Sequence, residues 1–302
     1  MKYYKRLEDI EQKIQTVVTL GKFDGVHRGH QKLLNEVFEI AGEQGLETCV
    51  FTFSVLPQAK LMHKKSMTIL SNSERRDLLE EMGTDILIEC PFTDAIRKME
   101  PEEFVQRILV DRLKCRAAVV GTDFRFGKDR AGTPETLAEA GKKLGIEVRV
   151  IEKLMYGDRE ISSTFIREEL VKGDIRKVNS LLGYPFYVEG YVVHGEHNGT
   201  KIGFPTANLK PDEHKILPPN GVYETETAVS GECFRSITNI GTRPTLGGHN
   251  ISIETNIPGF EGDIYGEFMK VRFIRLMRPE RKFAGLEELK EQIAKDIGSL
   301  RI

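Results

Sequence analysis

Apolar and polar positions in the first half of the chain follow two alternating patterns. Short apolar runs rich in β-branched residues are typical of buried parallel strands, and they occur at residues 17–20, 47–53, 85–90, 116–120 and 147–151. Stretches with helical composition and spacing occur at residues 31–41 and 73–82, from 101 onward, and from 133 to 145. Strand and helix therefore alternate, which predicts an α/β domain with an open parallel sheet and ligand sites at the carboxyl ends of strands.

The pattern changes beyond a short expected helix at 174–182, which Gly183, Tyr184 and Pro185 end. We therefore predict two domains, 1–183 and 184–302. Short alternating runs, separated by glycine, proline and asparagine turns, predict a small antiparallel β-barrel for the second domain. These runs lie at 186–193, 221–228, 234–240, 251–256 and 268–273, and a C-terminal helix is expected at 286–296.

The composition limits the class of protein, its cellular compartment and its ligands. The 302 residues are 39% hydrophobic and 30% charged, which is ordinary for a globular protein long enough for two cores. The chain shows no unbroken apolar run that would span a membrane and no apolar signal segment at its start, so a cytoplasmic protein is expected. Four widely spaced cysteines predict free thiols rather than a disulfide or a zinc site. The formal charge of −2 favours small phosphorylated ligands over nucleic acid, and no membrane or obligate protein partner is expected.

The stretch 19–30, TLGKFDGVHRGH, joins the first strand to the first helix. Gly21 and Gly25 allow backbone amides to approach a ligand closely, and the start of the following helix favours phosphate. His27 and His30 are three residues apart, so in a helix both imidazoles share one face and can contact one phosphoryl group. Glycines and histidines at such a junction can also serve only a tight turn and a helix cap.

Two further segments follow predicted strands. The loop 121–133, GTDFRFGKDRAGT, combines three glycines with cationic residues, as a mobile loop over phosphates would, although a solvated surface loop fits equally well. The segment 161–170, ISSTFIREEL, offers three hydroxyl groups at a helix start, with Arg167 one turn later. A cap needs only one hydroxyl. The two additional hydroxyl groups and the arginine therefore indicate a binding site for an anion.

These three segments together resemble the bacterial bifunctional riboflavin kinase/FAD synthetase family, whose first domain carries the HxGH signature of the nucleotidylyltransferase superfamily. The resemblance implies a Rossmann-like fold and adenylylation of FMN. It places His27, His30 and Arg167 in catalysis, and the FRFG loop against nucleotide and flavin. The implied ATP contacts are Gly21, Phe23, Asp24, Gly25, Ser163 and Thr164, and the implied flavin contacts are Asp123, Phe124, Arg125 and Phe126. Two positions depart from the family: Lys22 stands where many members have Asn, and Ser54-Val55-Leu56-Pro57 replaces the usual Asp-Pro-His-Pro.

The second domain holds another glycine-dense segment, GEHNGTKIGFPTANL at 195–209. Its backbone amides can wrap phosphates, and oxygen atoms of Thr206 and Asn208 can hold a divalent cation. The same residues can also merely close a hairpin turn. Glu254 follows in a predicted strand. A lone strand glutamate is usually solvated, but beside Mg-ATP it can orient and deprotonate an attacking hydroxyl.

This segment resembles the riboflavin kinase module, whose G-x-x-x-G-x-PTAN signature is matched from Gly199 to Asn208. The resemblance implies that Thr206 and Asn208 bind Mg²⁺ and ATP phosphates, that Glu254 is the base for the ribityl hydroxyl, and that Arg243 contacts flavin. The remaining implied ATP contacts are Gly199, Lys201 and Gly203. One departure is Asn256, where relatives usually have His.

The sequence thus predicts an enzyme that phosphorylates riboflavin to FMN with Mg-ATP and adenylylates FMN to FAD, with these flavins and ATP as substrates and products. Two alternatives remain. The first domain can have lost adenylylation, because of the substitutions at 54–57, which would leave a riboflavin kinase. The protein can also be a regulator that binds flavin or nucleotide without turnover.

Overall fold

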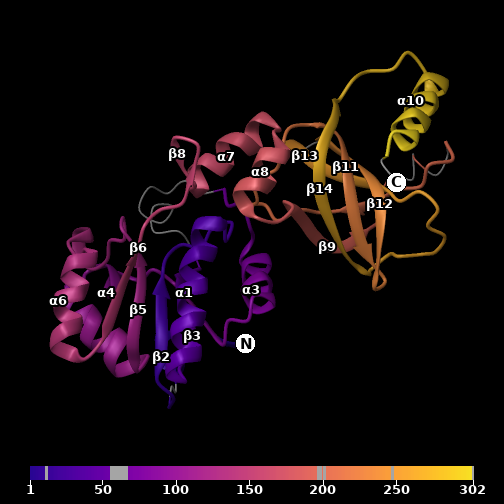
Figure 1. The fold of residues 1–302 in the computed structure, drawn as a ribbon. Helices are drawn as coiled ribbons and strands as arrows, with labels where there is room; N and C mark the ends of the chain where they lie inside the picture. The colour runs from indigo at the N-terminus through magenta and orange to yellow at the C-terminus, as the bar shows by residue number, and fades with distance from the viewer. Residues whose placement is uncertain (11–12, 55–66, 196–198, 200–201, 246–247, 301–302) are drawn as a thin grey trace. The chain divides into compact units, whose positions relative to one another are not determined.

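The computed structural model describes all residues except 11–12, 55–66, 196–198, 200–201, 246–247 and 301–302, and it leaves the side chains of 243–250 undescribed. The described chain divides into two compact units, Met1–Ser163 and Thr164–Ile302 (Figure 1). None of the helices in the described ranges is long and apolar enough to cross a membrane.

The first unit is built on a six-stranded sheet in which every neighbouring pair is parallel, as predicted. In spatial order the strands are β1 (Lys2–Tyr4), β4 (Ile86–Cys90), β3 (Glu47–Phe53), β2 (Thr16–Leu20), β5 (Cys115–Gly121) and β6 (Glu147–Ile151). Strand β1 was not predicted, because three residues are too few to establish an alternating pattern. A two-stranded hairpin, β7 (Met155–Tyr156) with β8 (Arg159–Glu160), was also missed.

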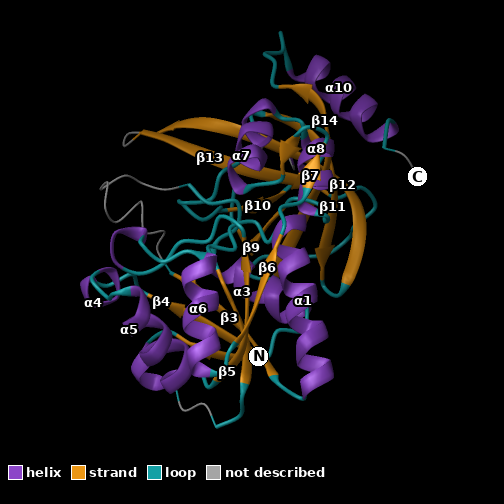
Figure 2. Ribbon diagram, turned by 60° about the vertical axis from the view of Figure 1, so that its left-hand side comes forward, coloured by secondary structure: helices purple, strands orange, loops and turns teal. Residues whose placement is uncertain are grey.

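Helices cover both faces of this sheet (Figure 2). The described helical segments are η1 (Leu7–Asp9), α1 (Arg28–Gln44), α3 (Asn72–Glu81), α4 (Asp94–Arg97), α5 (Pro101–Phe104), the π-helical η2 (Val105–Arg112), η3 (Lys128–Arg130) and α6 (Pro134–Leu144). Val17 of β2 packs under α1, whereas its neighbour Val18 joins the larger core on the other face. Helix α3 starts earlier than predicted: Ser71, not Ser73, is its N-cap, in a capping box with Glu74.

The order of the strands places two loops at one point. From β2 the chain proceeds outward to β3 and β4, and it then returns to β5 on the other side of β2. The direction of winding reverses there, and in open α/β sheets the crevice at such a reversal is where ligands bind. The loops that follow β2 and β5, residues 21–27 and 121–133, both begin at this edge.

The second unit contains the predicted antiparallel barrel, which is closed. Its strands run in the order β10 (Ala207–Leu209), β13 (Gly248–Asn256), β12 (Glu232–Thr245), β11 (Gly221–Val229), β14 (Phe268–Pro279) and β9 (Tyr187–Val193). The unit also includes α7 (Ser163–Lys172) from Thr164 onward, α8 (Ile175–Leu182), which packs on β14, and α10 (Leu286–Gly298). An ion pair of 2.8 Å between Arg278 and Asp296 joins α10 to the barrel, as expected for the final helix.

The barrel interior holds a ladder of buried hydroxyl groups between β11, β12 and β13. Four hydrogen bonds of 2.7–2.9 Å connect them in one chain. In order, the hydroxyls belong to Thr227, Ser236, Thr225, Thr238 and Thr255. Because these side chains are fully buried and paired, the ladder fixes the register of the strands that carry the second candidate site.

Candidate active sites in the two domains

The two histidines of the first loop lie against each other. Helix α1 begins at Arg28, and His27 is its N-cap, where Nδ1 accepts a hydrogen bond of 3.4 Å from the backbone N–H of His30. The two imidazole rings stack with centroids 3.7 Å apart. The spacing of three residues therefore brings the imidazoles together, although the helix begins one residue after His27.

The backbone between Lys22 and His27 is strained. Phe23 and Val26 have φ angles of +46° and +34°, which side chains rarely adopt, while Gly25 at +83° has no such penalty. Each strained residue costs about 1–3 kcal/mol. Several contacts hold the loop in this shape: the Ile69 N–H donates to the Asp24 carboxylate at 2.8 Å, and the Ser163 hydroxyl donates to the Asp24 carbonyl at 2.8 Å.

Gly21 in this loop and Gly29 in the first turn of α1 make room for neighbouring aromatic rings. A Cβ at Gly21 would lie 3.1 Å from the Phe23 ring, and a Cβ at Gly29 would lie 3.1 Å from Cε1 of His27. Phe23 is fully buried, with its ring centroid 5.0 Å from that of His30. Gly29 was not singled out from the sequence, although its place inside His-x-Gly-His is the signal that would have found it.

The surroundings of His30 favour the neutral form of its imidazole. Burial lowers its pKa well below the ordinary histidine value, and the neighbouring His27 and Arg75 lower it further. Its Nδ1 is buried and has no hydrogen-bond partner among the described residues. The side chain therefore offers one N–H donor and one acceptor rather than a positive charge.

The loop after β5 divides into a buried half and an exposed half. The Phe126 ring is buried against Phe104, with centroids 5.6 Å apart, and it stacks on Phe124. A Cβ at Gly132 would meet the Phe126 ring at 2.6 Å. Asp123 is exposed and pairs with Lys153 at 3.2 Å, and Arg125 is also exposed. The two phenylalanines thus anchor the loop, and the polar side chains are the ones that face solvent.

Not every expected residue can be placed beside these groups. Thr164 and Arg167 lie in α7 within the second compact unit, whereas His27, His30 and Ser163 belong to the first. Val55, Leu56 and Pro57 fall outside the described residues, as does Lys201. Arg243 lies in β12, and its side chain is outside what the structure describes.

Strand register places the candidate base of the barrel beside two amides. Asn208 of β10 and Asn239 of β12 are the direct neighbours of Glu254 in β13, one on each side. These positions share one face of the sheet. The residues flanking Glu254, Ile253 and Thr255, are fully buried, so Glu254 points away from the interior. It is half-buried and accepts a 3.3 Å hydrogen bond from the Ser252 hydroxyl.

Two glycines cradle the side chains of the PTAN segment. A Cβ at Gly195 would lie 2.7 Å from Cγ of Asn208, and a Cβ at Gly199 would meet the Phe204 carbonyl and lie 3.3 Å from the Thr206 hydroxyl. Asn256 also supports this segment, because its Nδ2 donates to the Pro205 carbonyl at 2.8 Å. Asn256 thus ties β13 to the residues before Thr206.

The fold and these groups define a class: an α/β domain with paired histidines at its switch point, followed by a closed barrel with a carboxylate between two amides. Comparison with known proteins identifies the family. The model of the FAD synthetase family matches residues 9–165, and that of riboflavin kinase matches residues 182–302. The chain belongs to the family of bifunctional riboflavin kinase/FMN adenylyltransferases.

Individual relatives agree over nearly the whole chain. The bifunctional riboflavin kinase/FMN adenylyltransferase of Bacillus subtilis is 37% identical over 95% of this chain and 92% of its own length. The corresponding protein of Escherichia coli K12 is 35% identical over 98% and 96%. A solved structure described as a macrolide-efflux protein from Streptococcus pneumoniae matches with a TM-score of 0.91 and 30% identity, covering 99% of this chain and 98% of that one.

Proposed function

We propose that this chain makes FAD from riboflavin in two ATP-dependent steps, one in each domain. In the first step the ribityl 5′-hydroxyl attacks the γ-phosphorus of ATP, giving FMN and ADP. In the second step an FMN phosphate oxygen attacks the α-phosphorus of a second ATP, giving FAD and pyrophosphate. Membership of the family supports both activities. We propose that the boundary between the two functional domains lies at Gly183–Tyr184.

The observation that carries the kinase assignment is the alignment of Asn208, Glu254 and Asn239 across three strands. This register puts the Glu254 carboxylate directly across from the amide of Asn208, which can contact ATP phosphates. Glu254 then accepts the proton of the ribityl hydroxyl as that hydroxyl attacks. Lys201, Gly203 and Arg243 remain proposed contacts to ATP or flavin.

The residues of the PTAN segment fit Mg²⁺ bound together with ATP. Magnesium prefers oxygen ligands and keeps several non-protein ones, so one hydroxyl and one amide oxygen suffice beside phosphates. Thr206 and Asn208 supply these oxygens, and the missing side chains of Gly195 and Gly199 leave room around them. The ion would neutralise charge on the phosphates during transfer.

For the adenylyl step we propose that His27 and His30 contact the ATP phosphates at the start of α1. Backbone N–H groups at the helix start and the helix dipole favour an anion there. Ser163, Thr164 and Arg167 would hold further phosphate oxygens. Asp123 and Arg125 are exposed and would contact FMN, whereas the packed rings of Phe124 and Phe126 would hold the shape of the loop.

The decisive test of the kinase site is Glu254→Gln, which removes the base but keeps the shape. We expect formation of FMN from riboflavin and Mg-ATP to fall at least ~100-fold, while riboflavin still binds and FMN is still converted to FAD. Glu232→Gln, at an exposed position of the adjacent strand β12, is the matched control and should retain wild-type rates. Unchanged FMN formation in Glu254→Gln would remove the assignment.

The wild-type chain decides between the two-step function and its alternatives. It is incubated with Mg-ATP and either riboflavin or FMN, and the flavins are separated by chromatography over time. FMN followed by FAD supports the proposal. FMN alone would leave a riboflavin kinase, and no product from either flavin would favour a binding protein.

We also propose that these reactions take place in the cytoplasm without an obligate protein partner, nucleic acid or membrane. All four cysteines, Cys49, Cys90, Cys115 and Cys233, are free thiols. Burial raises the pKa of Cys90 and Cys115 to about 12, which keeps both as unreactive thiols. Unpaired cysteines are usual in a reducing compartment.

A further inference from the structure

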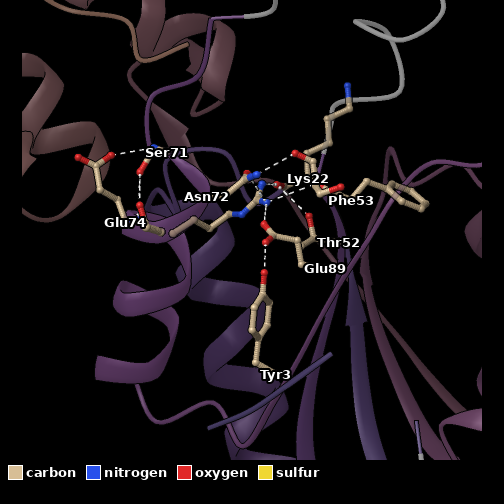
Figure 3. Close-up of polar contacts among 11 residues, drawn as sticks. Tyr3, Lys22, Thr52, Phe53, Ser71, Asn72, Glu74 and Glu89 are labelled. Atoms are coloured by element: carbon tan, nitrogen blue, oxygen red, sulfur yellow. Dashed lines mark hydrogen bonds and ion pairs between the residues drawn. The ribbon is translucent and has the colours of Figure 1, made fainter. Parts of the chain in front are cut away.

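A buried ion pair lies next to residues 21–30, which we call the histidine loop. Neither residue of the pair has a role in the reactions proposed so far. Arg75 of α3 and Glu89 of β4 form it, and their side chains are only 5% and 2% exposed. The second Glu89 oxygen accepts a hydrogen bond of 2.6 Å from the Tyr3 hydroxyl. Figure 3 shows Tyr3, Glu89, Thr52 and Lys22 close together, with dashed lines that mark the polar contacts of this cluster. Removing two charges from water costs free energy, which only good pairing geometry and further hydrogen bonds can offset.

The guanidinium connects the ends of three neighbouring strands. It donates to the Lys22 carbonyl just after β2 at 3.0 Å and to the Phe53 carbonyl at the end of β3 at 3.3 Å, and it pairs with Glu89 near the end of β4. The Asn72 side chain accepts a further bond at 3.0 Å. The guanidinium reaches these four acceptors through two separate nitrogens, Nη1 to Lys22 and Nη2 to the other three, and the single ammonium group of a lysine cannot span them.

The Lys22 carbonyl is the point at which the strained loop begins. It accepts a second hydrogen bond from the Thr52 hydroxyl at 3.2 Å, and Thr52 is the register partner of Glu89. The next residue, Phe23, has φ +46° and packs against His30. A backbone in this region persists only where its surroundings over-determine it. Fixing this carbonyl therefore fixes the start of the segment that carries both histidines.

We propose that Arg75 is a positioning residue for adenylyl transfer, which holds the histidine loop against the ends of β2, β3 and β4 through the Lys22 carbonyl. Arg75 touches no reacting group; it acts through His27 and His30. This proposal rests on the adenylyltransferase function proposed above. Because a displacement of about 1 Å at catalytic groups can cost about 100-fold in rate, loss of the clamp should be visible in kcat.

The test uses the full-length chain with the double substitution Arg75→Met/Glu89→Leu. Removing both charges avoids leaving one of them buried without its partner, so the fold is expected to persist. A second variant, Arg75→Lys, keeps the charge opposite Glu89 but loses the fork. The matched control is Arg76→Met, the same change one residue further along α3, where the side chain is partly exposed and pairs with Asp77.

Two measurements are made on each variant. The first is kcat and KM for conversion of FMN to FAD, with riboflavin phosphorylation by the same preparation as an internal standard. The second is hydrogen–deuterium exchange of the peptide 21–31, compared with the strand peptide 115–121. The exchange measurement reports how firmly the loop backbone is held against local opening, and it needs no turnover.

We expect the double variant to lose at least tenfold in kcat for FAD formation with little change in KM for ATP, and to exchange faster at 21–31 but not at 115–121. Arg75→Lys should fall between the double variant and wild type, and Arg76→Met should match wild type. The proposal is overturned if the double variant keeps its kcat, if the loop peptide exchanges as in wild type, or if Arg76→Met loses as much. A wild-type chain that forms no FAD would refute the proposed function instead, and the exchange data would still decide whether Arg75 holds the loop.

Discussion

In the candidate kinase site, Gly195 lies directly against the side chain of Asn208. A methyl group at position 195 would contact the Asn208 amide, 2.7 Å from Cγ and 2.9 Å from Oδ1. Ordinary contacts between such atoms are about 3.5–4.0 Å, so in Gly195→Ala the amide has to move by roughly 1 Å. Asn208 neighbours Glu254 in the register and is a proposed ligand of Mg²⁺. The substitution therefore displaces a ligand without removing it.

The size of the effect follows from that displacement. Misplacing a catalytic group by 1 Å can cost about 100-fold in rate, and the crowding itself destabilises by about 1–3 kcal/mol. Within the described residues, the amide makes one weak hydrogen bond, of 3.4 Å, to the Thr206 carbonyl, so a rotation of this side chain costs little. We therefore expect kcat for riboflavin phosphorylation to fall roughly 10- to 100-fold. The loss of folding stability should lie near the lower end of the range of about 1–3 kcal/mol.

The assay is FMN formation from riboflavin at saturating Mg-ATP, with FAD formation from FMN as the standard for the other domain. Gly190→Ala is the matched control, since a Cβ at Gly190 of the neighbouring strand β9 would meet nothing closer than 3.9 Å. The control should keep its rate. If Gly195→Ala phosphorylates riboflavin as fast as Gly190→Ala does, Asn208 has no placed role in the reaction and the magnesium assignment is wrong.

Two other predictions concern stability. Because burial and the neighbouring His27 and Arg75 lower the pKa of His30 in the folded state, the unfolded chain takes up its proton first on acidification. The associated stability is present above the ordinary histidine pKa of about 6.5 and is lost as the pH falls below it. Calorimetry of His30→Asn from pH 7.5 to 5 should show a flatter loss than wild type, and parallel curves would contradict this. In the barrel, Thr238→Val breaks two 2.9 Å hydrogen bonds and leaves Thr255 without its hydroxyl partner, so it should cost about 2–3 kcal/mol. Calorimetry should show a lower transition temperature for the barrel, which is identified as the transition that moves to higher temperature when riboflavin is added. An unchanged transition temperature would refute the prediction.

Much of the architecture could be predicted because it depends on local pattern. The strands β2, β3, β4 and β5 are largely apolar runs next to helical stretches, and β6 alternates apolar and charged residues. The regular succession of these strands and helices predicts the parallel arrangement. The same holds for the barrel strands β9 and β11, whose alternation is uninterrupted by glycine-rich loops. The exceptions are short: β1 and β10 have three residues each, and they are strands only because a neighbouring strand pairs with them.

The candidate sites divide in the same way. His27, His30 and Glu254 could be chosen from the sequence because a spacing or a flanking motif marks them. The neighbours of Glu254 could not, since the register of β10, β13 and β12 is a property of the closed barrel. The role of Asn256 was invisible for the same reason: its hydrogen bond to Pro205 joins residues 51 positions apart.

Arg75 and Glu89 show why buried polar pairs escape a reading of the sequence. In α3 the segment NSERRDLLEE resembles any solvated helix, and Arg75 does not differ locally from Arg76. Glu89 interrupts an apolar strand, which is the one local sign that something opposes it, because a lone buried carboxylate would be too costly. A charged residue at an inward position of a predicted core strand therefore implies an unseen partner. When that strand ends at the edge where ligands bind, the partner is a reasonable candidate for holding the site in place.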